Sequence, residues 1–444
     1  AESALRDCLA LGADRAIHLS DSVFAGADTL ATARALAMAL DKLEPDLVMC
    51  GMFSIDSETG QVPSEIAELM NRPQITAARK IMPGDVSNTL WVERQTDEGF
   101  QIYELTLPAV ISVTELIIAG RRATEEEQES GKAKPLEVWT AANLGGDQSL
   151  FGEAGSPTWV ADIRSTHLDR AGTVISGENP QEAANLIANY LKENGLFQPR
   201  QQREMTQPRR PVPSNPDPRR AVWVFTELVD GRPRLVTHEL LGAAQEMADG
   251  LDGEVAAVLV GEPDAADLVP DLVASGADKV YLASDEGLGG YDTECYTSLL
   301  VSAIKCYQPH VVLIPSTTNG RDLASRVAAR LQVGLTGDCV DLNLDADGNV
   351  AQLKPAFGGN IVSPIYSRTT PIMATVRPGM LLARRPDASV QPNVVYLDRS
   401  WNGESRVRLL KSMVEPDLGA TKLDDANVVV AVGMGVGGPE NLPV

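Results

Sequence analysis

The chain contains 444 residues, and at roughly 150 residues per domain this length predicts about three domains with sizeable cores. Its 43% hydrophobic and 5% aromatic content, with short Val/Ile/Leu runs between Ala-rich stretches, favours an α/β fold over disorder or a fibre. The 38 basic residues against 61 acidic ones give a formal charge of −23, which argues against nucleic acid as a partner.

No stretch approaches the roughly 20 uninterrupted apolar residues that cross a membrane, so we expect no direct membrane insertion. The cysteines form no C-x-x-C pair and the four His stand far apart, which argues against a metal site with local ligands. We expect buried free thiols and a reducing, cytoplasmic location. The cysteines are Cys8, Cys50, Cys295, Cys306 and Cys339.

The chain opens inside a predicted helix, without an initiator Met, and stops six residues after a glycine cluster. We interpret it as an internal piece of a longer protein, truncated at both ends. In the first block, a strand is expected after Gly12-Ala13-Asp14. It is followed by a helix over 28–43, a strand over 46–50 and a helix over 63–70.

The polar loop over 54–62 is the most informative stretch of this block. It leads from a buried strand into a helix, so free N–H groups and the positive end of a helix dipole suit a phosphate. Ser57, Thr59 and Gln61 add side-chain donors. The alternative is that Ser57 or Thr59 only caps the helix. Asp56 would repel an anion, so we expect it to orient backbone amides or to accept from a ribose hydroxyl.

Residues 198–220 are rich in Pro and Arg, which cannot build a core and favour an extended chain. This segment predicts a linker between two folded blocks. The second block starts with elements that have no counterpart in the first: a strand over 221–226, a helix over 240–251 and a strand over 255–260. A helix over 292–305, a strand over 311–314 and a helix over 323–331 follow.

The two blocks repeat one another. Leu11–Ile17 recurs as Ser275–Tyr281, and Pro45–Gly51 recurs as Pro309–Pro315, both at an offset of 264 residues. Six matched segments occur in the same order, which predicts two copies of one domain. Apolar runs between helices are typical of strands buried on both faces of a parallel sheet, and ligands bind at the carboxyl edge of such sheets. The predicted fold class is therefore α/β, with two homologous doubly wound, Rossmann-like domains.

The second block offers two further candidate ligands. Arg321 lies in the loop equivalent to 54–62 and is able to stabilise a phosphate or an anionic ring, or else forms a salt bridge to Asp322 or another acid. Lys354 precedes paired glycines that either admit a flat ligand or form a plain turn. Near the end, Gly433–Gly438 reads G-x-G-x-x-G after a strand, a weak dinucleotide signal without its helix. No Ser/His/Asp set or P-loop motif occurs, so no catalytic or metal residue is assigned.

The motifs together are similar to those of electron transfer flavoproteins. The first block resembles the β subunit and the second the α subunit. The matching segments are 11–16, 27–33, 55–68 and 154–158 in the first block, and 317–331, 334–339, 355–360, 375–379 and 433–441 in the second.

The resemblance implies two main domains related by a pseudo-twofold that pair with each other, plus a mobile flavodoxin-like flavin domain. The implied boundaries are a β-type domain over 1–145, an arm over 146–197 that wraps the flavin domain, the linker over 198–220, an α-type domain over 221–405 and the start of the truncated flavin domain over 406–444.

The resemblance also implies the cofactors. The β-side loop in this family holds AMP or, in electron-bifurcating members, FAD, while a second FAD belongs to the domain that is truncated here. By motif match this role falls on Ser54, Asp56, Ser57, Thr59, Gly60, Gln61 and Val62. Val62 after Gln61 is closer to the bifurcating pattern, which favours FAD and makes NADH a possible substrate.

The family's partners are flavoprotein dehydrogenases and iron–sulfur or quinone-reducing proteins. Gly120–Thr124 resembles the loop by which the family's β subunit docks dehydrogenases, but an acidic run over 125–129 follows where the family has an apolar anchor. This run forms either an altered docking site or an exposed acidic turn without a partner. The sequence thus predicts an electron carrier that works through FAD, by electron bifurcation if NADH is the donor. The alternative is a non-redox module of the adenine-nucleotide α-hydrolase type that binds AMP or ATP.

Overall fold

The computed structural model describes residues 2–115, 117–165, 179–195, 209–211, 216–345, 347–398, 405–414, 429 and 431–441. Contacts divide the chain into a large unit, Ala1–Thr166 with Met205–Val414, and a small unit, His167–Glu204 with Glu415–Val444. Residues 166–178 and 196–197 of the expected arm, most of the linker over 198–220 and about half of the expected flavin-domain start lie outside the described residues. Within the small unit the structure describes helix α6 (Pro180–Glu193).

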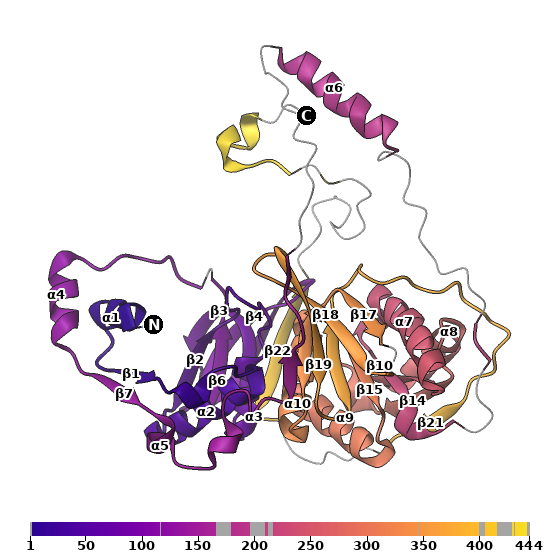
Figure 1. Ribbon diagram of the computed structural model, residues 1–444, viewed down its shortest axis with the longest axis horizontal. Coiled ribbons are helices and arrows are strands. Elements are labelled where there is room, and N and C mark those ends of the chain that lie inside the picture. The colour runs from indigo at the N-terminus through magenta and orange to yellow at the C-terminus, as the bar shows by residue number, and fades with distance from the viewer. Residues whose placement is uncertain are drawn as a thin grey trace. The chain divides into compact units, whose positions relative to one another are not determined.

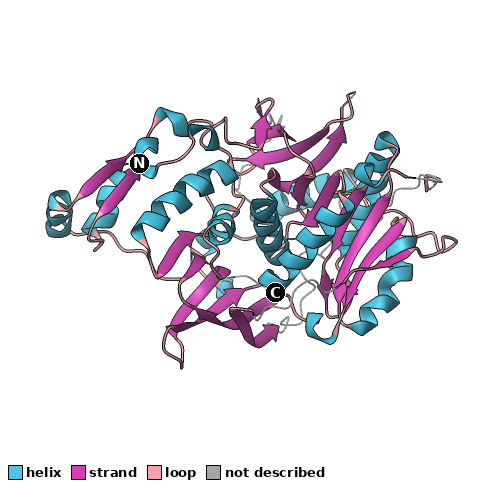
Figure 2. Ribbon diagram, turned by 90° about the horizontal axis from the view of Figure 1, so that it is seen from below, coloured by secondary structure: helices cyan, strands magenta, loops and turns pink. Residues whose placement is uncertain are grey.

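The second half of the large unit contains a seven-stranded, fully parallel sheet of order β16-β20-β15-β10-β13-β14-β21 (Figures 1 and 2). Its strands are β10 (Val222–Thr226), β13 (Val255–Gly261), β14 (Lys279–Ser284), β15 (Val311–Pro315), β16 (Leu335–Cys339), β20 (Ile372–Val376) and β21 (Val394–Tyr396). The connecting helices are α7 (Leu235–Leu251), α8 (Val269–Ala274), α9 (Thr293–Tyr307) and α10 (Thr318–Leu331). The strand order reverses between β10 and β15, so this is the predicted α/β, doubly wound fold.

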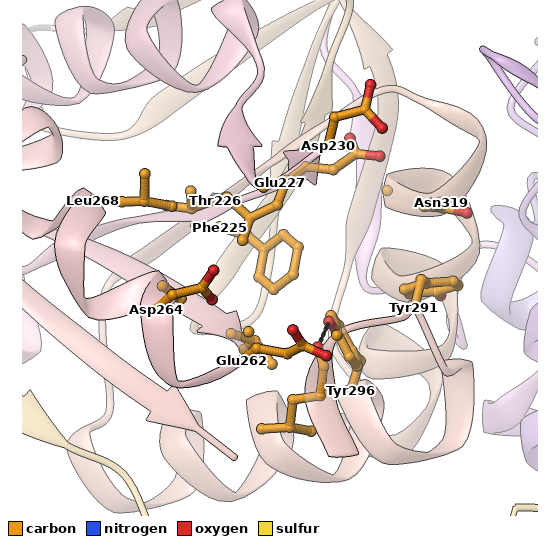
Figure 3. A pocket seen from close by; sticks show the side chains of 18 residues that line it. Phe225, Thr226, Glu227, Asp230, Glu262, Asp264, Leu268, Tyr291, Tyr296 and Asn319 are labelled. Carbon is orange, nitrogen blue, oxygen red and sulfur yellow. Dashed lines mark hydrogen bonds between the residues drawn. The ribbon is translucent and has the colours of Figure 1, made fainter. Parts of the chain in front are cut away.

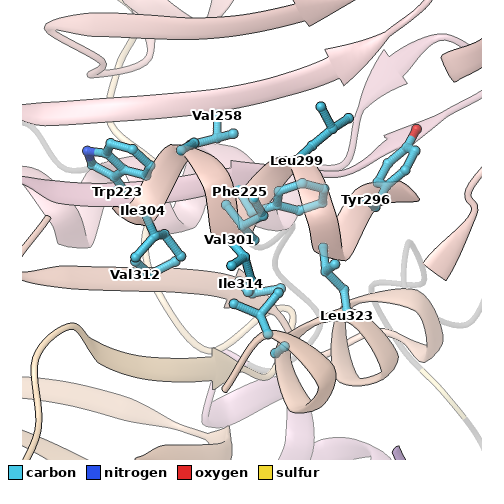
Figure 4. Close-up of a cluster of buried hydrophobic side chains, with 14 of the residues drawn as sticks. Trp223, Phe225, Val258, Tyr296, Leu299, Val301, Ile304, Val312, Ile314 and Leu323 are labelled. Atoms are coloured by element: carbon cyan, nitrogen blue, oxygen red, sulfur yellow. The ribbon is translucent and has the colours of Figure 1, made fainter. Parts of the chain in front are cut away.

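Both faces of this sheet are buried, as the uninterrupted apolar strands predict. Trp223 and Phe225 pack with α9 and α10 on one face (Figure 4), while Val222 and Val224 pack with α7 on the other. Two helices, α7 and α10, begin earlier than their apolar periodicity indicates, which places their first residues at 240 and 323. For α10 the reason is local, because the Thr317 hydroxyl accepts from the Gly320 N–H and caps a polar first turn.

The first half contains a six-stranded sheet of order β2-β6-β3-β4-β5-β22 and a separate parallel pair, β1-β7. The strands are β1 (Ala16–Leu19), β2 (Leu47–Gly51), β3 (Gln74–Pro83), β4 (Thr89–Gln95), β5 (Gly99–Thr106), β6 (Ala109–Val113), β7 (Leu136–Trp139) and β22 (Val407–Val414). The helices are α1 (Glu2–Ala10), α2 (Thr29–Leu43), α3 (Val62–Leu69), α4 (Glu125–Ala133) and α5 (Ala141–Leu144). The acidic run over 125–129 therefore opens a helix, capped by Thr124 and Glu127, where the sequence suggested a turn.

Each half supplies strands to a sheet of the other, and in the second half this is a separate five-stranded sheet beside the seven-stranded one. After the first half, β8 (Thr158–Val160) and β9 (Arg164–Ser165) pair antiparallel with β19 (Ile361–Ser367) of the second half. After the second half, β22 pairs antiparallel with β5 of the first; in Figure 1 it is the yellow strand beside the purple sheet. The remaining strands are β17 (Asp341–Leu344), β18 (Val350–Ala356) and the small hairpin β11 (Leu228–Val229) and β12 (Arg232–Pro233).

All five cysteines are free thiols. Cys295 and Cys339 are buried and Cys50 is partly buried, but Cys8 and Cys306 are exposed, so the expectation of buried thiols is wrong for these two. The helices of the described residues include none that is both long and apolar enough to span a bilayer.

Candidate functional site

A cavity of about 420 Å³ lies where the two halves meet, a size within the roughly 300–1,000 Å³ usual for small-molecule sites. The first half contributes the start of α2 and the loop that leads into α3, and the second contributes β16, β18 and β19. Strand β8 lies against β19 and adds its own side chains. The lining residues are Gly26, Ala27, Asp28, Thr29, Thr32, Ser54, Asp56, Ser57, Thr59, Gln61, Val62, Thr158, Trp159, Val160, Leu335, Thr336, Gly337, Lys354 and Ile365.

The loop before α3 owes its shape to left-handed backbone at two positions. Glu58 has a φ of 51° and Gly60 a φ of 66°. A Cβ at Gly60 would lie 2.9 Å from the Phe53 ring, so only glycine fits there. Asp56 Oδ1 accepts from the Ser57 amide at 2.7 Å. Hydrogen bonds from the Ser54 hydroxyl and from the Ser57 amide and hydroxyl lower the pKa of Asp56 and keep it ionised.

Helix α3 begins without a side-chain cap. Its N-cap residue is Gln61, which makes no capping hydrogen bond, so neither Ser57 nor Thr59 caps the helix. The backbone N–H groups and the positive dipole end of α3 thus remain available to an anionic group. Helix α2 differs, because Asp28 caps it through the Ala31 N–H.

Lys354 brings a buried cation to the opposite wall. Its side chain is 5% exposed, and Nζ donates to the Gly337 carbonyl at 2.7 Å. Burial lowers the pKa of Lys354, while the neighbouring Cys339 and Asp338 act in the opposite direction. A negatively charged ligand group would offset the cost of burying this charge.

Two more side chains fit an organic ligand with polar groups. The Thr336 hydroxyl is buried and has no hydrogen-bond partner among the described residues, which is the state of a donor that a ligand completes. Trp159 lines the cavity with 41% of its surface exposed and stacks on Tyr366 at 5.3 Å between ring centroids. Its indole offers a flat apolar surface for a ring.

The structure brings seven of the nine predicted site residues together around this cavity: Ser54, Asp56, Ser57, Thr59, Gln61, Val62 and Lys354. Gly60 shapes the loop without lining the cavity. Arg321 lies behind the loop, where Nη2 pairs with Asp338 at 3.0 Å and the guanidinium lies 5.2 Å from the Phe53 ring centroid. Of the two salt bridges that the sequence allowed, the structure thus has the one to another acid, Asp338, and not the one to Asp322.

Sequence reasoning did not assign several of the residues that line the cavity. Asp28 and Thr29 lie in the family-matching segment 27–33, and Thr336 lies in the matching segment 334–339. The signal was thus present in the sequence, but only the docking of the halves shows that these segments face the loop. Trp159 had no signal beyond its place in the expected arm.

A second cavity, of about 330 Å³, opens at the carboxyl end of β10 and β13 (Figure 3). Four carboxylates line it, and among the described residues of its wall there is no Lys or Arg: the acids are Glu227, Asp230, Glu262 and Asp264. Such a wall repels phosphate. The cavity between the halves is therefore the better site for an anionic ligand. The described residues hold no cluster of His, Cys, Asp and Glu suited to a metal ion.

Comparison with known proteins places these features in a family. The family model described as "Electron transfer flavoprotein domain" matches residues 1–144 and 222–400. The electron transfer flavoprotein subunit alpha of Thermoanaerobacterium thermosaccharolyticum is 37% identical over 225 residues, which are 50% of this chain and 68% of that protein.

Protein FixB of Azorhizobium caulinodans is 37% identical over 224 residues, 50% of this chain and 61% of that protein. The electron transfer flavoprotein subunit beta of T. thermosaccharolyticum is 38% identical over 189 residues, 42% of this chain and 72% of that protein. The chain thus spans about two thirds of the length of these relatives. It belongs to the electron transfer flavoprotein family and carries parts similar to both the α and the β subunit.

Proposed function

We propose that this chain is an electron carrier that holds FAD in the cavity between its two halves. The observation that carries the proposal is that seven predicted ligand residues, from both halves, line one cavity of about 420 Å³. FAD, when bound, supplies the electron-accepting and electron-donating chemistry, and the protein supplies binding, orientation and a tuned environment.

The residues fit an adenine dinucleotide. Lys354 and the uncapped start of α3 suit the negative charge of a phosphate. Thr336 is a free buried donor, and Asp56 is an ionised acceptor for a ribose hydroxyl. Trp159 offers a surface on which a ring stacks. We propose that Gly60 shapes the loop and that Arg321 supports it from behind, through its salt bridge to Asp338.

We further propose NADH or a flavoprotein dehydrogenase as the electron donor, and a flavoprotein, iron–sulfur or quinone-reducing protein as the acceptor. Helix α4, which is acidic and exposed, replaces the apolar anchor of the resembling docking loop, so the partner on this side is expected to be basic. On its cysteine usage we place the protein in the cytoplasm.

The experiment is to purify the full chain, record its visible absorption, denature it and identify the released nucleotide by chromatography. A yellow protein that releases FAD supports the proposal. A colourless protein that releases only AMP, or that binds AMP or ATP without any flavin, would sink the FAD assignment and favour a non-redox adenine-nucleotide module. Anaerobic NADH should bleach the flavin if the chain oxidises NADH in a bifurcating reaction. An unbleached flavin would contradict that part alone.

A further inference from the structure

Behind the wall of the cavity lies a buried carboxyl group that the proposed function does not use. Glu65 is on α3, one turn after Gln61, and is 1% exposed. Its Oε1 lies 3.0 Å from the Thr29 hydroxyl, and its Oε2 has no hydrogen-bond partner among the described residues. An ionised carboxylate with an unpaired buried oxygen would be costly, whereas a neutral acid in this position is not.

The hydroxyl of Thr29 faces two oxygen atoms. Besides Glu65 Oε1, it lies 2.7 Å from Gln61 Oε1. A hydroxyl has one proton to donate, so it can serve only one of two acceptors. Both contacts are satisfied together if Glu65 carries a proton and donates to Thr29, which in turn donates to Gln61.

The other solution would be to turn the amide of Gln61 round. Its Nε2 now lies 3.5 Å from the Leu335 carbonyl of the second half, so a turned amide would set oxygen against oxygen. Nε2 also lies 2.6 Å from where a Cβ of Gly337 would be, so the amide fits against the second half because residue 337 is glycine. The second half therefore fixes which way this amide points.

We propose that Glu65, as a neutral acid, is the positioning residue of the cavity: through Thr29 it holds the Gln61 amide in the orientation that faces both the ligand and the second half. This inference rests on the proposed nucleotide site for its functional meaning, but the arrangement itself belongs to the free protein. Glu65 does not line the cavity and acts only through Thr29 and Gln61, which do.

The surrounding charges agree with a neutral Glu65. Burial is the main cause that raises its pKa to about 8, and the negative charge of Asp28 adds to it, while the Thr29 hydrogen bond and Arg34 act in the opposite direction. Helix α10 packs against α3 and carries Arg326 and Arg330, but both pair with Glu68 and not with Glu65. Strand β6, behind α3, carries no charged residue.

The consequence is a proton-dependent cavity wall. When Glu65 ionises, its carboxylate accepts the hydrogen bond of the Thr29 hydroxyl, and Gln61 Oε1 then loses its donor. The Gln61 amide should become free to turn, and a ligand that relies on its fixed orientation should bind more weakly above pH 8 than below it.

The test follows the side-chain amide signals of Gln61 by ¹⁵N NMR in the full, nucleotide-free chain from pH 6.5 to 9.5. In the wild-type protein these signals should shift with a midpoint near pH 8. In the Glu65→Gln variant, whose amide donates to Thr29 at every pH, they should not shift. Thr29→Val should also abolish the shift, because it removes the hydroxyl that links Glu65 to Gln61. Thr29→Ser keeps this hydroxyl and should retain the shift.

A Gln61 signal that is pH-independent in the wild type, or that shifts equally in Glu65→Gln, would overturn the proposal. Binding is then measured by calorimetry with AMP and with FAD as probes. Affinity of the wild type should fall above pH 8 by at most about tenfold per pH unit, and that of Glu65→Gln should stay level. Absence of binding at any pH would overturn the proposed function, while the NMR titration would still decide the role of Glu65.

Discussion

Nε of Arg326, in the second half, lies 2.8 Å from Oε2 of Glu68 in the first, and the arginine side chain is only 1% exposed. Arg330 contacts the same carboxylate, so one acid on α3 holds two cations on α10. Burial opposes the charge of Glu68, but the hydrogen bonds and charges of these two arginines outweigh it and lower its pKa. The pairing fixes α3, and with it one wall of the cavity, against the second half.

We expect Glu68→Gln to lower the free energy of unfolding by up to about 3 kcal/mol, because it removes the charge-assisted hydrogen bonds to Arg326 and Arg330 and leaves Arg326 with Glu294, at 3.7 Å, as its acidic partner. Urea unfolding followed by circular dichroism measures the difference. Glu129→Gln is the matched control, since its pair with Lys132 is exposed and should be worth less than about 1 kcal/mol. Equal effects of the two substitutions would contradict a buried pairing between the halves.

We expect Gly337→Ala to weaken binding of AMP or FAD and to cost about 1–3 kcal/mol in stability. The added methyl group would lie 2.6 Å from Gln61 Nε2 and would push this side chain out of place. Gly290→Ala, where nothing lies within 4 Å of the new carbon, controls for substitution of a glycine in the same half. Calorimetric titration and thermal unfolding test both effects, and unchanged nucleotide affinity would place Gln61 away from the ligand.

We expect Lys354→Met to reduce affinity for AMP about tenfold or more, since it removes the buried positive charge and keeps the length of the side chain. The same change at the exposed Lys132 should have no effect. Dissociation constants measured at two salt concentrations would show whether charge is the cause. An unaltered constant for Lys354→Met would show that the phosphate lies elsewhere.

The raised pKa of Glu65 makes a prediction about stability. The folded protein holds this proton up to about pH 8, whereas an unfolded Glu loses it near pH 4.3. Between these values the folded state binds more protons, so raising the pH destabilises it. Glu65→Gln removes the titration. Its stability relative to wild type should therefore rise with pH, by at most about 1.4 kcal/mol per pH unit between about pH 4.5 and 8.

Urea midpoints of both proteins at pH 5, 6, 7 and 8 provide this measurement. Glu115→Gln, on the surface of the same half, is a suitable control and should give a constant difference. A constant difference for Glu65→Gln as well would mean that Glu65 is ionised in the folded state.

Much of the fold follows from the sequence, because its signals are local. Apolar runs such as Val311–Ile314 indicate buried parallel strands, and the repeat indicates two related domains. The antiparallel extensions were not predicted. Strands β4 and β5, for example, mix polar and apolar residues on partly exposed faces, so their pattern resembles that of a loop region.

The candidate site was predicted in part for the same reason. The loop from Ser54 to Val62 carries its donors within a few residues, and its position after a strand is visible in the sequence. The opposite wall is different, since Thr336 and Lys354 reach the cavity only because the halves dock face to face. The sequence spacing between these residues and the loop does not indicate that they lie on opposite walls of one cavity. The relay from Glu65 to Gln61 depends further on the placement of Thr29, which a sequence pattern cannot give.

The exchange of strands between the sheets has a consequence for how the chain tolerates being divided. Without β8 and β9 the second half would present β19 as a bare sheet edge, and without β22 the first half would present β5 in the same way. Unpaired edges are templates for aggregation. Either half produced alone is therefore expected to aggregate, and soluble protein should be recovered in good yield only when the two halves are produced together.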